Sequence, residues 1–306
     1  MNAIDHDGWR FRTLPRPALT SSAGSVAIAS LLFLLVTSLS SCTTSSGQIE
    51  IVKVPVPGAT VSAGRLGDYE TALTAIVSAF QRAVGLPRPD AALVVFPSRR
   101  SFEQGLLELG YTPALARSAS TFNAIGGAKA VLVNGAVVGR FTRARRVRLL
   151  AHELVHTLQY RFGGGTRGAS EQWLREGFAE WVACRITAHL GLGSFDLLRE
   201  EALGALAGAD VGLPPAPFDK LATFAQWVEA QGRYEAPLYA QAFIAAELLI
   251  EMRDVPTLVR YFERFRSTTE YQQVFTETFG LDRAAFERLF LRRWRETVSQ
   301  FSVRRE

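Results

Sequence analysis

The residues best suited to chemistry in this 306-residue chain form the pentapeptide His152-Glu153-Leu154-Val155-His156. On a helix, residues four apart lie one above the other, so both imidazoles project from one face and can bind a single zinc ion. Glu153 lies about 100° round the helix from His152 and can reach a water bound to that metal. Neutral imidazoles hold the ion, and a carboxylate that does not ligate it takes the proton of the water. The pentapeptide therefore predicts a catalytic zinc site with Glu153 as general base.

A helix whose two histidines merely pack or cap is the alternative. The neighbouring residues Val147, Leu150 and Leu158 make this helix apolar, and two unliganded histidines would be poorly placed in it. The context therefore favours ligation.

A second acidic pair follows in the segment WLREGFAEW, residues 173–181. Glu176 and Glu180 lie four apart and share one face of an expected helix. A catalytic zinc site needs a third protein ligand and one open position, so one carboxylate can bind the metal while the other accepts a hydrogen bond from a ligand histidine. Acids at this spacing usually form a solvated helix face, but the pentapeptide just upstream favours a functional pair.

These motifs carry a family resemblance. HELVH followed by WLREGFAEW resembles the gluzincin metallopeptidases, in particular the peptidase MA-like family of bacterial envelope proteins, and VVFPSRRSF at 94–102 resembles a strand and helix of that family. The aminopeptidase-N-like family shares the WLxEGFA segment. The similarity covers roughly residues 90–300. It implies zinc ligands at His152, His156 and Glu176, a general base at Glu153, and a supporting carboxylate at Glu180.

The family often places a tyrosine on a later helix to stabilise the oxyanion. The segment PLYAQAF resembles that helix start, which makes Tyr239 the candidate and Tyr234 the second choice. A tyrosine near a helix start that bridges core and solvent is the alternative.

One departure from the aminopeptidases concerns specificity. Their GxMEN signature ahead of HExxH is missing, and Gly126-Gly127-Ala128-Lys129-Ala130 stands there instead. This favours an endopeptidase, or a protein without peptidase activity. We also expect the strand Ala130–Val133 to offer an edge to which an extended peptide can hydrogen-bond.

The elements that must position these residues are mostly helical after Gly139. Upstream, apolar periodicity predicts a helix over 68–84, a buried strand at 93–96 and a helix at 101–110. Asn134-Gly135 predicts a hairpin between 130–133 and 136–138. Downstream, helices are expected at 142–162, 170–190, 194–207, 235–252, 255–267, 269–278 and 282–298.

The order of these elements indicates an α+β fold. We expect a zincin-like arrangement: a small mixed sheet with N-terminal helices, an active-site helix with HExxH, and a mostly helical C-terminal half. The peptidase domain would span 65–300, with an α/β part at 65–140 and a helical part at 141–300. Residues 42–64, rich in Ser, Thr, Pro and Gly, indicate a flexible tether with one short strand about 49–54.

The N-terminus has the pattern of a secretory signal. Basic residues precede an apolar run at 26–36, which is short for a membrane span, and small residues lead to Cys42. Leu39-Ser40-Ser41-Cys42 resembles the lipobox of bacterial lipoproteins, which implies cleavage after residue 41 and a lipid on Cys42. An uncleaved anchor over 23–39 is the alternative. Both place the rest of the chain outside the cytoplasm. The lipobox resemblance further implies a lipid-anchored protein of the bacterial cell envelope, a periplasmic or outer-membrane lipoprotein.

The composition limits the function classes. With 48% hydrophobic and 21% charged residues, the chain is globular rather than disordered. Two cysteines exclude a disulfide framework, and Cys184 lies in an apolar helical pattern, where a buried thiol is expected. A net charge of +5, mixed with acids, gives no argument for a nucleic-acid partner.

Together these features predict a zinc-dependent envelope peptidase, an endopeptidase that acts on a peptide or protein substrate. Its membrane contact would be the lipid anchor. The alternatives are a zinc-containing scaffold or peptide-binding lipoprotein without turnover, and a hydrolase of a non-peptide amide or ester.

Overall fold

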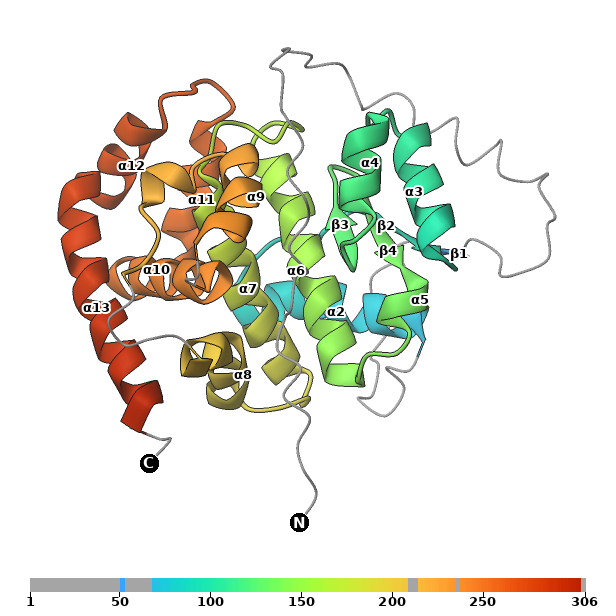
Figure 1. Ribbon diagram of the computed structural model, residues 1–306, viewed down its shortest axis with the longest axis horizontal. Coiled ribbons are helices and arrows are strands. Elements are labelled where there is room, and N and C mark those ends of the chain that lie inside the picture. The colour runs from blue at the N-terminus through green and yellow to red at the C-terminus, as the bar shows by residue number, and fades with distance from the viewer. Residues whose placement is uncertain (1–49, 53–67, 209–213, 235–236, 304–306) are drawn as a thin grey trace. The chain divides into compact units, whose positions relative to one another are not determined.

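The computed structural model describes residues 50–52, 68–208, 214–234 and 237–303 (Figure 1). The predicted signal sequence, Cys42 and most of the predicted tether lie outside these residues. The chain divides into two compact units, one of residues 17–158 and one that includes residues 159–306. The division falls inside helix α6 (Arg143–Phe162). A small mixed sheet and many helices make the fold α+β, as the sequence predicts.

The unit of residues 17–158 contains a four-stranded sheet. Its strands are β1 (Glu50–Val52), β2 (Ala92–Phe96), β3 (Ala124–Gly126) and β4 (Ala130–Asn134), and their order is β1-β2-β4-β3. β2 and β4 run parallel, whereas β1 and β3 are antiparallel to their neighbours. All five residues of β4 are buried, as expected of an inner strand. β3 therefore forms one edge of the sheet.

The helices of this unit are α2 (Tyr69–Val84), α3 (Arg99–Glu108), α4 (Pro113–Ala119) and α5 (Gly135–Val138), followed by the start of α6. α3 and α5 pack against the central strands β2 and β4. Figure 1 shows α3 and α4 side by side next to the strands. The rings of Phe96 and Phe102 pack 5.6 Å apart between β2 and α3, with Leu106 and Leu132 in the same apolar cluster.

The predicted hairpin about Asn134-Gly135 is wrong. β4 continues into α5 at Gly135, and the antiparallel neighbour of β4 is the upstream strand β3. A strand over 136–138 would need a free side of β4, but β2 and β3 occupy both sides. For the same reason Ala130–Val133 is not a sheet edge, and the expectation that a peptide pairs with it is also wrong.

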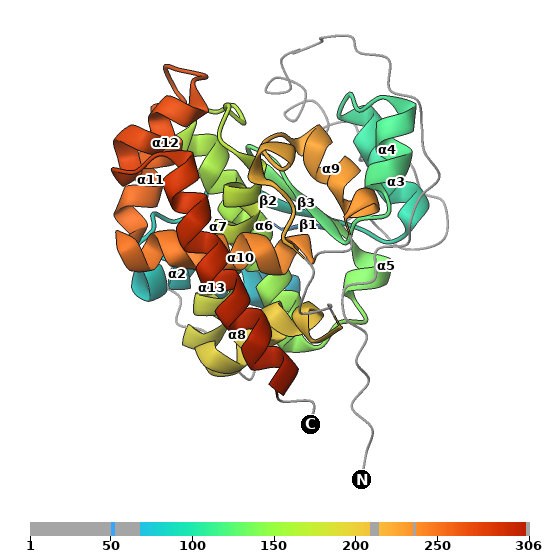
Figure 2. The ribbon, with the colours of Figure 1, turned by 60° about the vertical axis from the view of Figure 1, so that its left-hand side comes forward.

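The unit that includes residues 159–306 is helical. Its elements are α7 (Gln172–His189), α8 (Phe195–Leu203), η4 (Gly204–Gly208), η5 (Phe218–Lys220), α9 (Phe224–Arg233), α10 (Leu238–Met252), α11 (Val255–Arg264), α12 (Tyr271–Phe279) and α13 (Arg283–Val303). α7 is buried on almost every side, which makes it the central helix of this unit. α10 packs along it, and Figure 2 shows α13 crossing α10.

The closest approach of α7 and α10 is at Gly177. A Cβ on this residue would lie 1.9 Å from the carbonyl oxygen of Ala242 and 2.9 Å from the Cβ of Ala246. A side chain is therefore incompatible with this packing, and the glycine lets the two helices meet backbone to backbone.

The start of α7 is tied to later helices by a buried carboxylate. Glu171, 1% exposed, accepts hydrogen bonds from Trp173 Nε1 at 3.1 Å and from the Tyr261 hydroxyl at 3.2 Å. It also pairs with Arg283 of α13, whose guanidinium lies over the Trp173 ring. Because a buried charge is costly unless it is paired, these contacts fix where α7 begins.

The downstream helices that periodicity predicts are confirmed to within a few residues, and the aromatic residues of α11 and α12 form core, among them Phe262, Phe275 and Phe279. Cys184 is buried as predicted. The sequence prediction also lacks β3, α4, η5 and α9. The first three have seven residues or fewer, which is too short for a repeat to emerge. α9 carries Phe224, Trp227 and Val228 at helical spacing, which was a usable signal.

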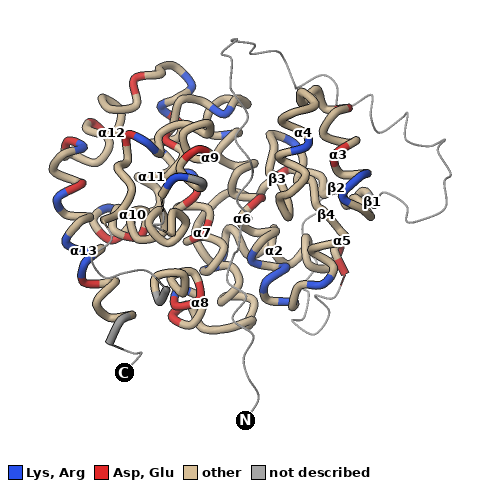
Figure 3. The backbone as a smooth tube through the Cα atoms, in the orientation of Figure 1, with Lys and Arg blue, Asp and Glu red and all other residues tan. Residues whose placement is uncertain are grey.

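Within the described part of the chain, no helix is both long and apolar enough to span a membrane. Figure 3 shows Lys and Arg interspersed with Asp and Glu along the described chain.

Candidate metal centre

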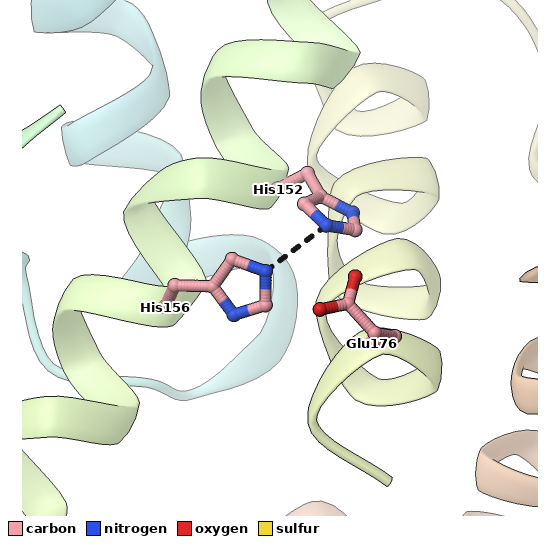
Figure 4. Close-up of side chains that lie close together, drawn as sticks. All are labelled: His152, His156 and Glu176. Carbon is pink, nitrogen blue, oxygen red and sulfur yellow. Dashed lines mark hydrogen bonds between the residues drawn. The ribbon is translucent and has the colours of Figure 1, made fainter. Parts of the chain in front are cut away.

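Helix α6 presents the two histidines at one point. The apolar residues Val147, Leu150 and Leu154 are buried, so this side of the helix forms core. His152 is 8% exposed and His156 is half-buried. Their Nε2 atoms lie 3.1 Å apart, and the rings stand nearly perpendicular at 83° (Figure 4). Two ligands of a tetrahedral zinc ion lie about 3.3 Å apart when each bond is about 2.0 Å, so the pair has a suitable spacing.

Glu176 of α7 is the third member of the set. One ligand atom from each of His152, His156 and Glu176 lies within 4.8 Å of the others. Figure 4 shows the carboxylate facing the two imidazoles. Two nitrogens and one carboxylate oxygen form a donor set suited to a zinc ion with one position left open, which is the arrangement of a catalytic rather than a structural site. These residues therefore fit the metal that the sequence predicts.

The Glu176 carboxylate is oriented from its own helix. Gln172, one turn earlier and 3% exposed, donates from Nε2 to Glu176 Oε1. Gln172 is not among the predicted site residues, although its spacing of four from Glu176 was a usable signal. Glu180 lies one turn beyond Glu176 and is 7% exposed. Its predicted hydrogen bond to a ligand histidine stays a prediction.

The residue before Glu176 is a buried cation. Arg175 donates to the carbonyl oxygen of Arg167 at 2.9 Å and to Ser170 Oγ at 3.1 Å, and it lies over the Tyr160 ring. Burial lowers the pKa of Arg175 to about 10, so the side chain remains charged at neutral pH. Its bonds fasten the preceding loop to the first turn of α7.

Glu153 takes a different position from the ligands. It is 8% exposed, and its Oε2 accepts a hydrogen bond of 2.6 Å from the backbone N–H of Gly126 in β3. It is not a member of the set that converges on the metal position. Its predicted role as general base stays a prediction. Gly126 enters the sequence argument only through the missing exopeptidase signature, and no motif links it to Glu153.

The two candidate tyrosines lie in the unit that includes residues 159–306. Tyr239 is the second residue of α10, half-buried, and its ring meets the ring of Trp227 edge-on at 5.2 Å. Tyr234 follows α9 in extended conformation and is also half-buried. α10 packs along α7, which carries Glu176, so Tyr239 is on a helix adjacent to a ligand helix. Its role in oxyanion binding stays a prediction.

No protein-family model, curated protein or solved structure matches this chain.

Proposed function

We propose that this protein is a zinc-dependent peptidase, an endopeptidase, of the bacterial cell envelope. One observation carries the proposal: one ligand atom from each of His152, His156 and Glu176 lies within 4.8 Å of the others, while Glu153 is not part of that set. The resemblance of HELVH and WLREGFAEW to the gluzincins supports the same reaction.

The roles of the residues follow from their chemistry. A bound zinc ion supplies a water of lowered pKa and a Lewis acid for the substrate carbonyl. His152, His156 and Glu176 would hold the ion, and Gln172 keeps the Glu176 carboxylate in place. Glu153 accepts the proton of the attacking water and returns it to the leaving nitrogen. We assign Glu180 to the support of a ligand histidine and Tyr239 to the oxyanion.

The strand that offers an edge to a peptide is β3 rather than β4. Among the described residues, β3 pairs with β4 on one side and with no strand on the other. An extended peptide can add to such an edge through backbone hydrogen bonds. Because the N–H of Gly126 at the end of β3 donates to Glu153, we place the peptide along the earlier residues of the strand. The lipidated Cys42 would hold the enzyme at the membrane, in the periplasm or on the outer membrane, where envelope proteins are its substrates.

The test is hydrolysis of a peptide library by the purified, zinc-loaded protein and its Glu153→Gln variant. We expect the variant to bind one zinc ion and to cleave nothing, because the amide cannot take the proton. Glu108→Gln, an exposed substitution at the end of α3, should retain activity. Full activity of Glu153→Gln would exclude the mechanism. Zinc binding without cleavage by the wild-type protein would instead favour a scaffold or peptide-binding lipoprotein.

A further inference from the structure

The backbone N–H and C=O groups of β3 point toward β4 in one residue and away from β4 in the next. Gly127 N–H donates to the carbonyl oxygen of Ala130, and Asn134 N–H donates to that of Asn123, so the odd-numbered residues near β3 bond to β4. In an antiparallel pair, the residues between these have their N–H and C=O groups turned the other way. Gly126, opposite Val131, is one of them. Its N–H therefore points away from the sheet.

The carboxylate of Glu153 receives that N–H. The distance from Gly126 N to Glu153 Oε2 is 2.6 Å, short even for a hydrogen bond to a charged acceptor. Because this N–H does not pair with β4, its bond to Glu153 leaves the hydrogen bonds between β3 and β4 intact. The bond holds one oxygen of the carboxylate in a fixed position.

A second contact explains why this residue is glycine. A Cβ on Gly126 would lie 2.4 Å from the backbone carbonyl oxygen of Glu153 and 2.9 Å from the Cβ of His156. Real Cβ atoms do not approach so closely, so any other residue would move β3 away from this turn of α6. The close approach and the hydrogen bond thus depend on the same missing side chain.

We propose that Gly126 is a positioning residue for the general base, its N–H fixing the orientation of the Glu153 carboxylate. A glutamate side chain has several rotatable bonds, and a base must be held within a fraction of an ångström of its proton to be effective. The inference rests on the proposed function, because the contact can serve catalysis only if Glu153 is the general base.

The contact itself can be tested without activity. In the protein labelled with ¹⁵N-glycine, we expect the Gly126 amide of Glu153→Ala to move upfield and to exchange with solvent about tenfold faster or more than in wild type. The Gly127 amide, bonded to Ala130, should not change and serves as internal control. An unchanged Gly126 amide would overturn the inference, whatever the activity.

The purpose is tested by the kinetics of Gly126→Ala. We expect kcat to fall by about 10²-fold, with KM and zinc stoichiometry close to wild type, since the base is misplaced while the ligands remain. Gly204→Ala, where a Cβ meets nothing within 4 Å, is the matched control. A kcat equal to wild type would overturn the inference. A wild-type protein that cleaves no peptide would contradict the proposed function instead, and the amide measurement separates the two failures.

Discussion

At the scale of single residues, the buried amide of Gln172 is the group that sets the Glu176 carboxylate. A carboxylate ligand has two oxygens and several rotamers. The hydrogen bond from Gln172 Nε2 to Glu176 Oε1 favours one rotamer of this side chain. In that rotamer the carboxylate faces the two imidazoles (Figure 4). Groups that support metal ligands in this way raise metal affinity without touching the ion.

We expect Gln172→Ala to weaken zinc binding by about 10–100-fold, because Glu176 must then be ordered when the metal binds. Zinc affinity would be measured by competition with a chromophoric chelator. Gln272→Ala, an exposed substitution on α12, should bind zinc as wild type does. Equal affinities of Gln172→Ala and wild type would show that the hydrogen bond has no part in ligation.

The residues of this site differ in how much the sequence alone could say of them. HELVH and EGFAE are each local in sequence, so helical spacing suffices to place their ligands on one face. The contact between Gly126 and Glu153 joins residues far apart in the chain. It depends on β3, a strand of three residues. A segment this short shows no periodicity of apolar residues from which its pairing could be predicted.

At the scale of elements, the packing of α7 against α10 depends on one missing side chain. Alanine is the better helix former by about 1 kcal/mol, so Gly177→Ala would stabilise α7 if the helix stood alone. In the protein, its Cβ would meet the Ala242 carbonyl, which belongs to the α10 backbone and cannot rotate away.

We therefore expect Gly177→Ala to lower the free energy of unfolding by roughly 1–3 kcal/mol, as overpacked cores do. Urea denaturation followed by circular dichroism would measure the change. Gly204→Ala has open space around the new Cβ and should change stability little. A Gly177→Ala variant with a higher free energy of unfolding than wild type would mean that α7 and α10 can move apart without loss of stability.

The first helix of the described chain makes stability depend on pH. Asp68 caps α2 and accepts hydrogen bonds from the Thr71 N–H at 2.6 Å and from its hydroxyl at 2.9 Å. These bonds lower the pKa of Asp68 below its ordinary value of 3.8. A lowered carboxyl pKa adds stability above the unfolded pKa, and this stability is lost as pH falls through the folded one.

Asp68→Ala should accordingly be less stable than wild type at neutral pH, and the difference should shrink as pH falls below 3.8. Urea midpoints across the acid range would measure it. Asp90→Ala, at an exposed aspartate in the loop before β2, is the control. A difference between Asp68→Ala and wild type that is the same at all pH values would contradict the assignment.

The elements also show where periodicity misleads. The apolar residues that follow Asn134-Gly135 predict a strand, since a run of this length suits either a strand or a helix. The segment forms the helix α5 instead, because β2 and β3 already flank β4 and leave no position for another strand beside it. The long helices α2, α6 and α7 are the elements that the sequence predicts best, because each spans several turns of one pattern.

At the scale of the whole molecule, the metal should act as a ligand of the folded state. The unfolded chain cannot hold His152, His156 and Glu176 within 4.8 Å, so zinc binds the folded protein far better than the unfolded one. A ligand with this preference stabilises by about 4 kcal/mol when its free concentration is about 1,000 times the dissociation constant.

Removal of zinc with a chelator should therefore lower the melting temperature of the wild-type protein, and added zinc should restore it. His156→Ala loses a ligand, so its melting temperature should respond weakly to zinc. His189→Ala, at the last residue of α7, keeps the ligand set and should respond as wild type does. Calorimetry of the three proteins with and without zinc makes the comparison within each chain, so any loss of stability from the substitution itself cancels. If the melting temperature of the wild-type protein did not change with zinc, these residues would not form a zinc site. The assignment of Glu153 as the general base of a zinc-dependent hydrolysis would then have no basis.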